Sequence, residues 1–170
     1  AKLNAYPDSD GDGIIDALDE FPTNPNFAFV YNAPGGDTNG ELGFEDLWPY
    51  RGDDDFNDMV VTYDYDIITT SNNQVIRLVA HYTIKNIGGS FENAFGFSLP
   101  VSPSLISNVS GQLINTDLLD IAPNGTEQGT AQNESVIFVV GNALYEEGKS
   151  FIITVDFNAP LEVAALGQVP

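Results

Sequence analysis

The feature that most constrains the fold is a pair of stretches, residues 59–66 and 74–86, in which apolar and polar residues alternate. Alternation is typical of β-strands, because successive side chains point to opposite faces of a sheet. Between the stretches stands Ser71-Asn72-Asn73, a turn signal that predicts a β-hairpin. The predicted inward residues are Met59, Val61, Tyr63, Tyr65, Ile76, Leu78, Ala80, Tyr82 and Ile84. The opposite face of the second stretch, which we expect to be half exposed, carries Val75, Arg77, Val79, His81, Thr83 and Lys85.

The rest of the chain also reads as short strands. Further strands are expected at residues 94–99, 105–113, 135–140 and 151–157, and only residues 14–20 and 142–147 have a helical pattern. Many short strands with few helices predict an all-β fold: a two-sheet β-sandwich, jelly-roll-like, with a short N-terminal calcium-loop segment. We divide the chain into that segment, residues 1–27, and the sandwich, residues 28–170.

The charge of the chain is strongly negative, and its acidic residues are clustered. Its 25 acidic and 5 basic residues give a formal net charge of −20. This charge excludes nucleic acid and anionic membranes as default partners and favours cations. Residues 8–66 contain 13 Asp and 3 Glu, opposed by Arg51 alone. Carboxylates crowded in this way either shift their pKa values upward or bind a metal ion.

The residue types that are absent exclude several chemistries. Because the sequence has no cysteine, it has no disulfide, no zinc–thiolate site, no iron–sulfur cluster and no cysteine nucleophile. The single histidine, His81, excludes a multi-histidine metal site and is the only base available to a serine–histidine triad. Since His81 lies within a predicted strand, between Val79 and Thr83, we expect it to be a packing or surface residue. No apolar run approaches the ~18 residues of a transmembrane helix.

Residues 8–19 have the spacing of a calcium-binding loop of the EF-hand type. Position six of the loop is Gly13, which permits the sharp turn that the loop requires. The segment resembles the calcium repeats of thrombospondin type-3 and dockerin-like proteins, and the alternative is an acidic, flexible linker. The predicted ligands are the side chains at positions one, three, five, nine and twelve and the carbonyl at position seven: Asp8, Asp10, Asp12, Asp16, Asp19 and Ile14.

A second acidic segment, residues 44–61, supplies an all-oxygen ligand set of the hard kind that calcium prefers. Carboxylates beside apolar residues need a cation to stay ionised, and Phe44, Leu47, Phe56 and Val60 are expected to anchor this segment to the sheet. The alternative is a solvated acidic loop at one end of the sandwich. The predicted ligands are Glu45, Asp46, Asp53, Asp55, Asn57 and Asp58.

Two stretches of the chain resemble a known family. Glu45-Asp46-Leu47-Trp48-Pro49, followed by Gly-Asp-x-Asp-Phe-Asn-Asp-x-Val-Val at residues 52–61, closely resembles the signature of the LruC domain of bacterial exported and surface proteins. Residues 88–99, with Asn93-Ala94-Phe95-Gly96-Phe97, are similar to that family's second block, with Ala94 where the family usually has Gly. Calcium-dependent binding modules of bacterial adhesins share the Asp-x-Asp-Phe-Asn-Asp core. The resemblance implies an exported protein without assigned enzymatic activity.

The resembled family normally continues past a proline with a further polar block. We therefore expect the domain to be truncated at its C-terminus and the chain to be part of a larger protein with neighbouring domains. The chain also begins with Ala1 rather than Met.

These observations predict a function that depends on calcium. We expect an extracellular recognition or adhesion module on the bacterial cell surface, which binds a peptide or glycan through Trp48, Tyr50 and Tyr31. The alternative is a calcium-rigidified spacer domain of a large surface protein. A glycoside-active enzyme has less support, because glycosidases need two carboxylates with opposed pKa values and here the carboxylates come as a crowd. The sequence therefore predicts a protein that is not an enzyme.

Overall fold

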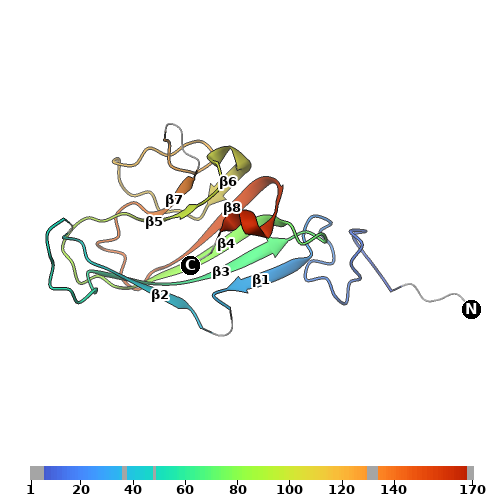
Figure 1. Ribbon diagram of the computed structural model, residues 1–170, viewed down its shortest axis with the longest axis horizontal. Coiled ribbons are helices and arrows are strands. Elements are labelled where there is room, and N and C mark those ends of the chain that lie inside the picture. Colours follow the sequence, from blue (N-terminus) through green and yellow to red (C-terminus); the bar gives the residue numbers. More distant parts are fainter. Residues whose placement is uncertain (1–5, 36–37, 48, 130–133, 168–170) are drawn as a thin grey trace, which may run out of the picture.

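The computed structural model describes residues 6–35, 38–47, 49–129 and 134–167. Within these ranges the chain forms β-strands and two short 3-10 helices (Figure 1). The strands are β1 (Phe29–Ala33), β2 (Gly40–Phe44), β3 (Met59–Thr69), β4 (Val75–Asn86), β5 (Phe95–Leu99), β6 (Ile106–Ser110), β7 (Ser135–Val140) and β8 (Ser150–Leu161). The 3-10 helices are η1 (Pro103–Leu105) and η2 (Val163–Leu166).

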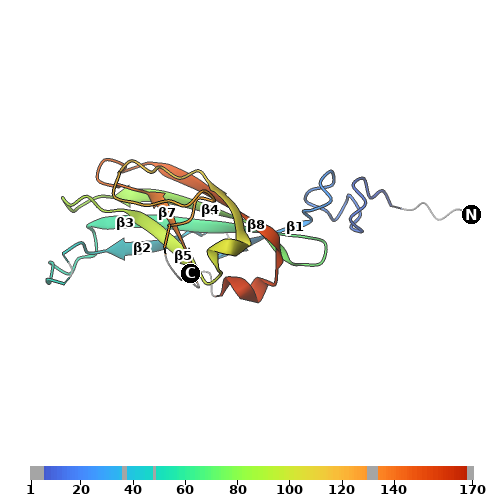
Figure 2. The ribbon, with the colours of Figure 1, turned by 90° about the horizontal axis from the view of Figure 1, so that it is seen from above.

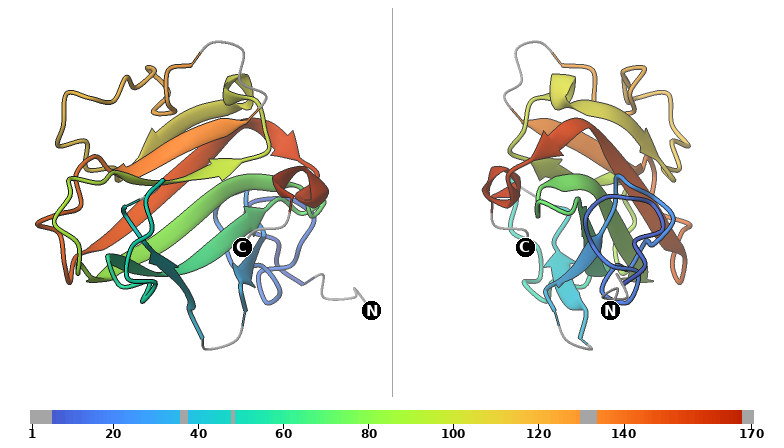
Figure 3. Two further views of the ribbon diagram at one scale, coloured as in Figure 1. Left: turned by 60° about the vertical axis from the view of Figure 1, so that its left-hand side comes forward. Right: turned by 90° about the vertical axis from the view of Figure 1, so that its right-hand side faces the viewer.

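The strands form two packed antiparallel sheets, which confirms the predicted all-β sandwich. The larger sheet has the order β1-β3-β4-β8-β6, and β2 also pairs with β3. The smaller sheet contains β5 and β7 and covers one face of the larger sheet (Figures 1 and 2). Both β1 and β2 lie along the same edge of β3, β1 beside residues 65–69 and β2 beside residues 59–63 (Figure 3).

The hydrophobic core lies between the two sheets. On β3 the buried side chains alternate as predicted, from Met59 to Tyr65, and they pack with the inward residues of β4 and β8. The predicted hairpin is present, with Asn73 in its turn at a positive φ of 59°. Tyr82 on β4 contacts Phe95 and Phe97 on β5, so aromatic side chains join the two sheets.

One part of the predicted alternation on β4 is wrong. Val75 is fully buried, whereas Ile76 is half-buried. The register of β4 against β3 shifts between Ile68 and Thr69, so that Thr69 pairs with Val75 and Ile68 pairs with Arg77. A bulge of this kind inserts one extra residue and reverses the inward and outward positions beyond it.

The two predicted helices are also wrong. Residues 14–20 and 142–147 form turns and bends, with backbone hydrogen bonds from Leu18 N to Ile15 O and from Glu146 N to Ala143 O. Each segment is only 6 or 7 residues long, and nucleation makes so short a helix unfavourable without packing on an apolar face. No helix in the described part of the chain is long and apolar enough to cross a membrane.

The two acidic segments lie at opposite ends of the long axis of the sandwich. Residues 6–27 lie beyond the end where β1 begins, and residues 45–47 and 49–58 lie between β2 and β3 at the other end (Figures 1 and 2). The N-terminal segment contacts the sandwich through Phe27, whose ring lies 4.9 Å from the guanidinium carbon of Arg77, and through Ala28 N, which donates to Thr69 O. The fold therefore separates the two predicted calcium sites.

Candidate metal centres

The N-terminal acidic loop brings three predicted ligands together. One carboxylate oxygen from each of Asp8, Asp10 and Asp12 lies within 4.8 Å of the others, and we call these residues the N-terminal cluster. Asp8 accepts hydrogen bonds from the backbone N–H groups of Gly11 and Gly13 at 2.7 and 3.2 Å. Gly13 has a φ of 99°, as expected for the turn at position six of the loop. Alternate residues of this loop thus converge their oxygens on one region.

The other predicted ligands of this loop lie outside the N-terminal cluster. Both carboxylate oxygens of Asp16 accept hydrogen bonds from Ser9, one from its N–H and one from its hydroxyl group, each at 2.7 Å. Asp19 is buried, with 8% of its surface exposed, and its Oδ1 accepts a hydrogen bond from Phe21 N. The N–H of Ile14, whose carbonyl is the predicted ligand, donates to Asp12 Oδ1.

Unpartnered oxygens in this loop fit a hard cation. The Oδ2 atoms of Asp10, Asp12 and Asp19 are buried and have no hydrogen-bond partner. A buried carboxylate oxygen without a partner is costly, and a calcium ion coordinated by carboxylates would remove this cost. The residues present at the N-terminal cluster therefore suit Ca²⁺.

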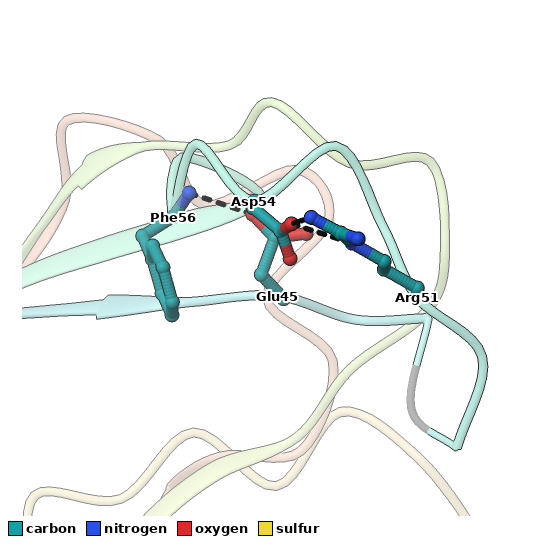
Figure 4. Close-up of polar contacts among 4 residues, drawn as sticks. All are labelled: Glu45, Arg51, Asp54 and Phe56. Carbon is teal, nitrogen blue, oxygen red and sulfur yellow. Dashed lines mark hydrogen bonds and ion pairs between the residues drawn. The ribbon is translucent and has the colours of Figure 1, made fainter.

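A second set of three carboxylates lies in the loop between β2 and β3. Oxygens of Glu45, Asp53 and Asp55 lie within 4.8 Å of one another, and we call these residues the loop cluster. Glu45 Oε1 accepts a hydrogen bond from Phe56 N at 2.6 Å (Figure 4), whereas Glu45 Oε2 is buried and unpartnered. A Cβ atom at Gly52 would overlap Glu45 Oε2, so a side chain here would displace the Glu45 carboxylate from its present position.

The backbone of this loop is held in an uncommon conformation. Asp54 and Phe56 have positive φ angles of 61° and 54°, which non-glycine residues rarely adopt and which concentrate at functional sites. Arg51, the only basic residue among residues 8–66, pairs with Asp54, and its Nε lies 2.7 Å from Asp54 Oδ2 (Figure 4). The positive charge of Arg51 is therefore paired with Asp54, which is not a member of the loop cluster.

The remaining predicted ligands of this segment join it to the chain after β4. The carboxylate of Asp58 accepts a hydrogen bond from Asp46 N at 3.0 Å, and Asp46 Oδ2 accepts one from Asn93 Nδ2 at 3.3 Å. The carbonyl of Asp58 accepts hydrogen bonds from the backbone of residues 88 and 89. The side-chain amide of Asn57 donates to Asp55, a member of the loop cluster. The six predicted ligands therefore divide between two neighbouring groups.

A pocket of about 250 Å³ lies where these two parts of the chain meet. Its acidic side chains come from the β2–β3 loop, and its large apolar side chains come from β2, β3 and β5. The lining residues are Phe44, Glu45, Asp46, Asp58, Met59, Asn93, Ala94, Phe95 and Gly96. The pocket is thus lined both by Glu45 of the loop cluster and by residues 93–96, which lie within the second stretch that resembles the LruC family.

The structure does not bring the predicted recognition aromatics together. Tyr50 lies in the β2–β3 loop and is 79% exposed. Tyr31 lies on β1 opposite Ile67, near the other end of β3, and its hydroxyl group donates to Asn73 Oδ1 at 2.8 Å. Trp48 lies outside the described residues.

A third group of potential ligands was missed at the sequence level. Asp64 and Asp66 on β3 and His81 on β4 each place a ligand atom within 4.8 Å of the others. His81 is half-buried on the face of the larger sheet opposite the core, in agreement with its predicted place on a half-exposed strand face. The alternation of Asp64 and Asp66 and the position of the hairpin turn are the signals that could have identified this group.

Calcium stoichiometry is expected to separate the two acidic clusters. Because the clusters lie at opposite ends of the sandwich, the double substitution Asp10→Asn/Asp12→Asn should remove one calcium equivalent and leave the other. Glu45→Gln/Asp53→Asn should remove the calcium equivalent of the loop cluster and keep that of the N-terminal cluster. Calorimetric titration of calcium into chelator-treated protein measures both. An unchanged stoichiometry in either double variant would contradict that assignment, and Asp120→Asn, at an exposed loop carboxylate, is the control.

The fold and these clusters define a class: an antiparallel β-sandwich that carries carboxylate groups at both ends and on one sheet face. The chain belongs to a family described as a domain of unknown function, DUF4842, whose family model matches residues 73–162. The matched region runs from the turn before β4 to the residue after β8, and it includes His81 and Asn93 but neither the N-terminal cluster nor the loop cluster. No curated protein and no solved structure matches the chain.

Proposed function

We propose that the protein is a calcium-dependent recognition module of a bacterial surface or adhesive protein, and that it binds a peptide or glycan outside the cell. The observation that carries this proposal is the pocket beside the loop cluster, where carboxylates, an amide and aromatic side chains line one cavity. The resemblance of residues 45–61 and 88–99 to the LruC domain supports an exported protein. Millimolar extracellular calcium suits loops of moderate affinity.

Calcium would act by fixing the β2–β3 loop. Bound among Glu45, Asp53 and Asp55, the ion would offset the repulsion between their charges and hold the loop in one conformation. Glu45 is both a member of the loop cluster and a lining residue of the pocket, so an ordered loop would also shape the pocket wall. Preorganisation of this kind lowers the entropic cost of binding a ligand.

The pocket suits a ligand with both polar and apolar groups. Phe44, Met59 and Phe95 supply apolar surface, and Asn93 supplies an amide that can donate and accept hydrogen bonds. With a net charge of −20, the protein would bind an acidic ligand only if a bound cation mediated the contact. Sugars and peptides combine apolar surface with hydroxyl or amide groups that can hydrogen-bond, and these groups carry no negative charge.

A spacer domain is the second candidate, and one observation favours it. The two acidic clusters lie at opposite ends of the long axis, where bound calcium would stiffen the two ends of the unit (Figure 1). In this function calcium rigidifies the loops and no ligand binds. An enzymatic function is not proposed, because the N-terminal cluster and the loop cluster each crowd three carboxylates rather than presenting a pair with opposed environments.

A binding screen in calcium and in chelator tests the proposal. Glycan and peptide arrays should give a ligand that binds in calcium and is released by chelator. Asp55→Ala should abolish that binding, whereas Asp10→Asn, at the opposite end of the sandwich, should leave it unchanged. If no array yields a ligand in calcium while calcium still raises the melting temperature, the spacer function replaces recognition.

A further inference from the structure

The face of the larger sheet opposite the core carries a group of side chains that the proposed function does not use. Asp64 on β3 pairs directly with His81 on β4 in the antiparallel register, and Asp66 stands two residues further along β3 on the same face. His81 Nε2 lies 3.1 Å from Asp66 Oδ2, and ligand atoms of all three residues lie within 4.8 Å of one another. Paired strands within a sheet hold this arrangement, whereas the N-terminal cluster and the loop cluster are built on loops.

The charges around this group leave it negative. Two basic residues share this face of β4: Arg77 pairs with Asp156 on β8, where its Nε lies 2.6 Å from Asp156 Oδ1, and Lys85 is exposed four residues beyond His81 along the strand. His81 contacts the carboxylate of Asp66, and Asp64 adds a second carboxylate oxygen within 4.8 Å. With His81 neutral the group carries two negative charges, and a dication would balance them.

The donor types distinguish this group from the calcium clusters. Calcium takes oxygen ligands, whereas an imidazole nitrogen suits zinc and other first-row transition metals. Asn32 on β1 donates a hydrogen bond from its side-chain amide to Asp66 Oδ1 at 2.6 Å. A contact of this kind orients a ligating carboxylate from outside the metal shell.

We propose that Asp64, Asp66 and His81 bind one first-row transition-metal dication, with Zn²⁺ as the representative ion. Three protein ligands leave a tetrahedral zinc ion one position for water or for a group from a partner. The site is independent of the calcium clusters, because it shares no residue with them. It is also independent of the proposed recognition function.

The single histidine makes the test specific. Chelator-treated protein is first saturated with calcium, which fills the oxygen-only sites, and ZnCl₂ is then titrated while the imidazole resonances are followed by NMR. The chain has one histidine, so every imidazole signal belongs to His81. The expected result is a shift of these signals that saturates at one zinc equivalent and is not reversed by excess calcium.

Substitutions complete the test. His81→Gln should abolish the calorimetric zinc signal, and Asp64→Asn should weaken zinc affinity at least tenfold. Asp10→Asn/Asp12→Asn and the loop variant Asp120→Asn should leave zinc binding unchanged. Imidazole signals that do not move with zinc, or equal zinc affinity in wild-type protein and His81→Gln, would overturn the proposal and leave His81 and Asp66 as a structural pair. The wild-type NMR titration decides the matter even if a variant fails to fold.

Discussion

Removal of calcium is expected to lower the melting temperature by about 5–10 °C for each site whose folding is coupled to the sandwich. An ion at a hundredfold excess over its dissociation constant stabilises the native state by about 2.7 kcal/mol. For a chain of this length, 1 kcal/mol corresponds to about 2–4 °C. The physical cause is the set of buried carboxylate oxygens without a hydrogen-bond partner, such as Glu45 Oε2 and Asp10 Oδ2, which a bound cation would coordinate.

Scanning calorimetry in excess calcium and in chelator measures this difference. The loop cluster should contribute more than the N-terminal cluster, because its loop connects two strands of the larger sheet, whereas residues 6–27 precede β1 and are joined to the sandwich at one end. Glu45→Gln/Asp53→Asn should therefore lose most of the calcium-dependent shift, and Asp10→Asn/Asp12→Asn should keep most of it. Equal melting temperatures in calcium and in chelator would contradict calcium binding at these clusters. Both acidic segments would then be solvated loops without a bound ion.

Truncation of Tyr82 is expected to cost about 3–5 kcal/mol in the free energy of unfolding, as for other large aromatic residues in cores. Tyr82 is 2% exposed, and its ring lies 5.1 Å from that of Phe95 and 5.6 Å from that of Phe97. Its hydroxyl group lies 3.0 Å from that of Tyr65 on β3. Burial is the main cause that raises the pKa of both phenols above the ordinary value, so both are neutral at physiological pH.

Urea unfolding of Tyr82→Ala in saturating calcium measures this cost. Tyr82→Phe keeps the ring and removes only the hydrogen bond, so it should cost about 1–3 kcal/mol through the unpaired Tyr65 hydroxyl group. Tyr145→Ala, at a residue that is 80% exposed, should stay within about 0.5 kcal/mol of wild type. A Tyr82→Ala variant as stable as Tyr145→Ala would show that the aromatic contacts between the sheets carry little of the stability.

Most strands could be predicted from the sequence, whereas β1 and β2 could not. The hairpin of β3 and β4 was predicted from its alternation, and the strand Ser135–Val140 was predicted from its continuous apolar run. β2 contains two glycines in five residues and was missed, since glycine disfavours strands and this strand forms by pairing with β3. The bulge near Val75 was missed because tertiary pairing, rather than local pattern, determines it.

The candidate sites show the same division between local and long-range information. The N-terminal cluster follows from spacing within twelve residues, so Asp8, Asp10 and Asp12 were predicted together. The six ligands predicted in residues 44–61 divide into two groups, and one group includes Asp46, which Asn93 contacts from 47 residues further along the chain. No local spacing predicts that hydrogen bond. Alternation alone places Asp64 and His81 on outward faces, but a hairpin centred on Asn72 would pair Asp64 with Ala80, and the bulge near Val75 shifts the register so that Asp64 pairs with His81.

The interrupted edge formed by β1 and β2 has a consequence for self-association. A long, continuous edge strand offers its unpaired backbone groups to other chains, and strand addition of this kind leads to aggregation. Here the exposed side of β3 is covered by two five-residue strands in succession, and the strand at the other edge, β6, is also five residues long. None of these edges offers more than a short template, and the net charge of −20 adds repulsion between copies. Short edge strands and like charge therefore both disfavour strand addition between copies of this chain.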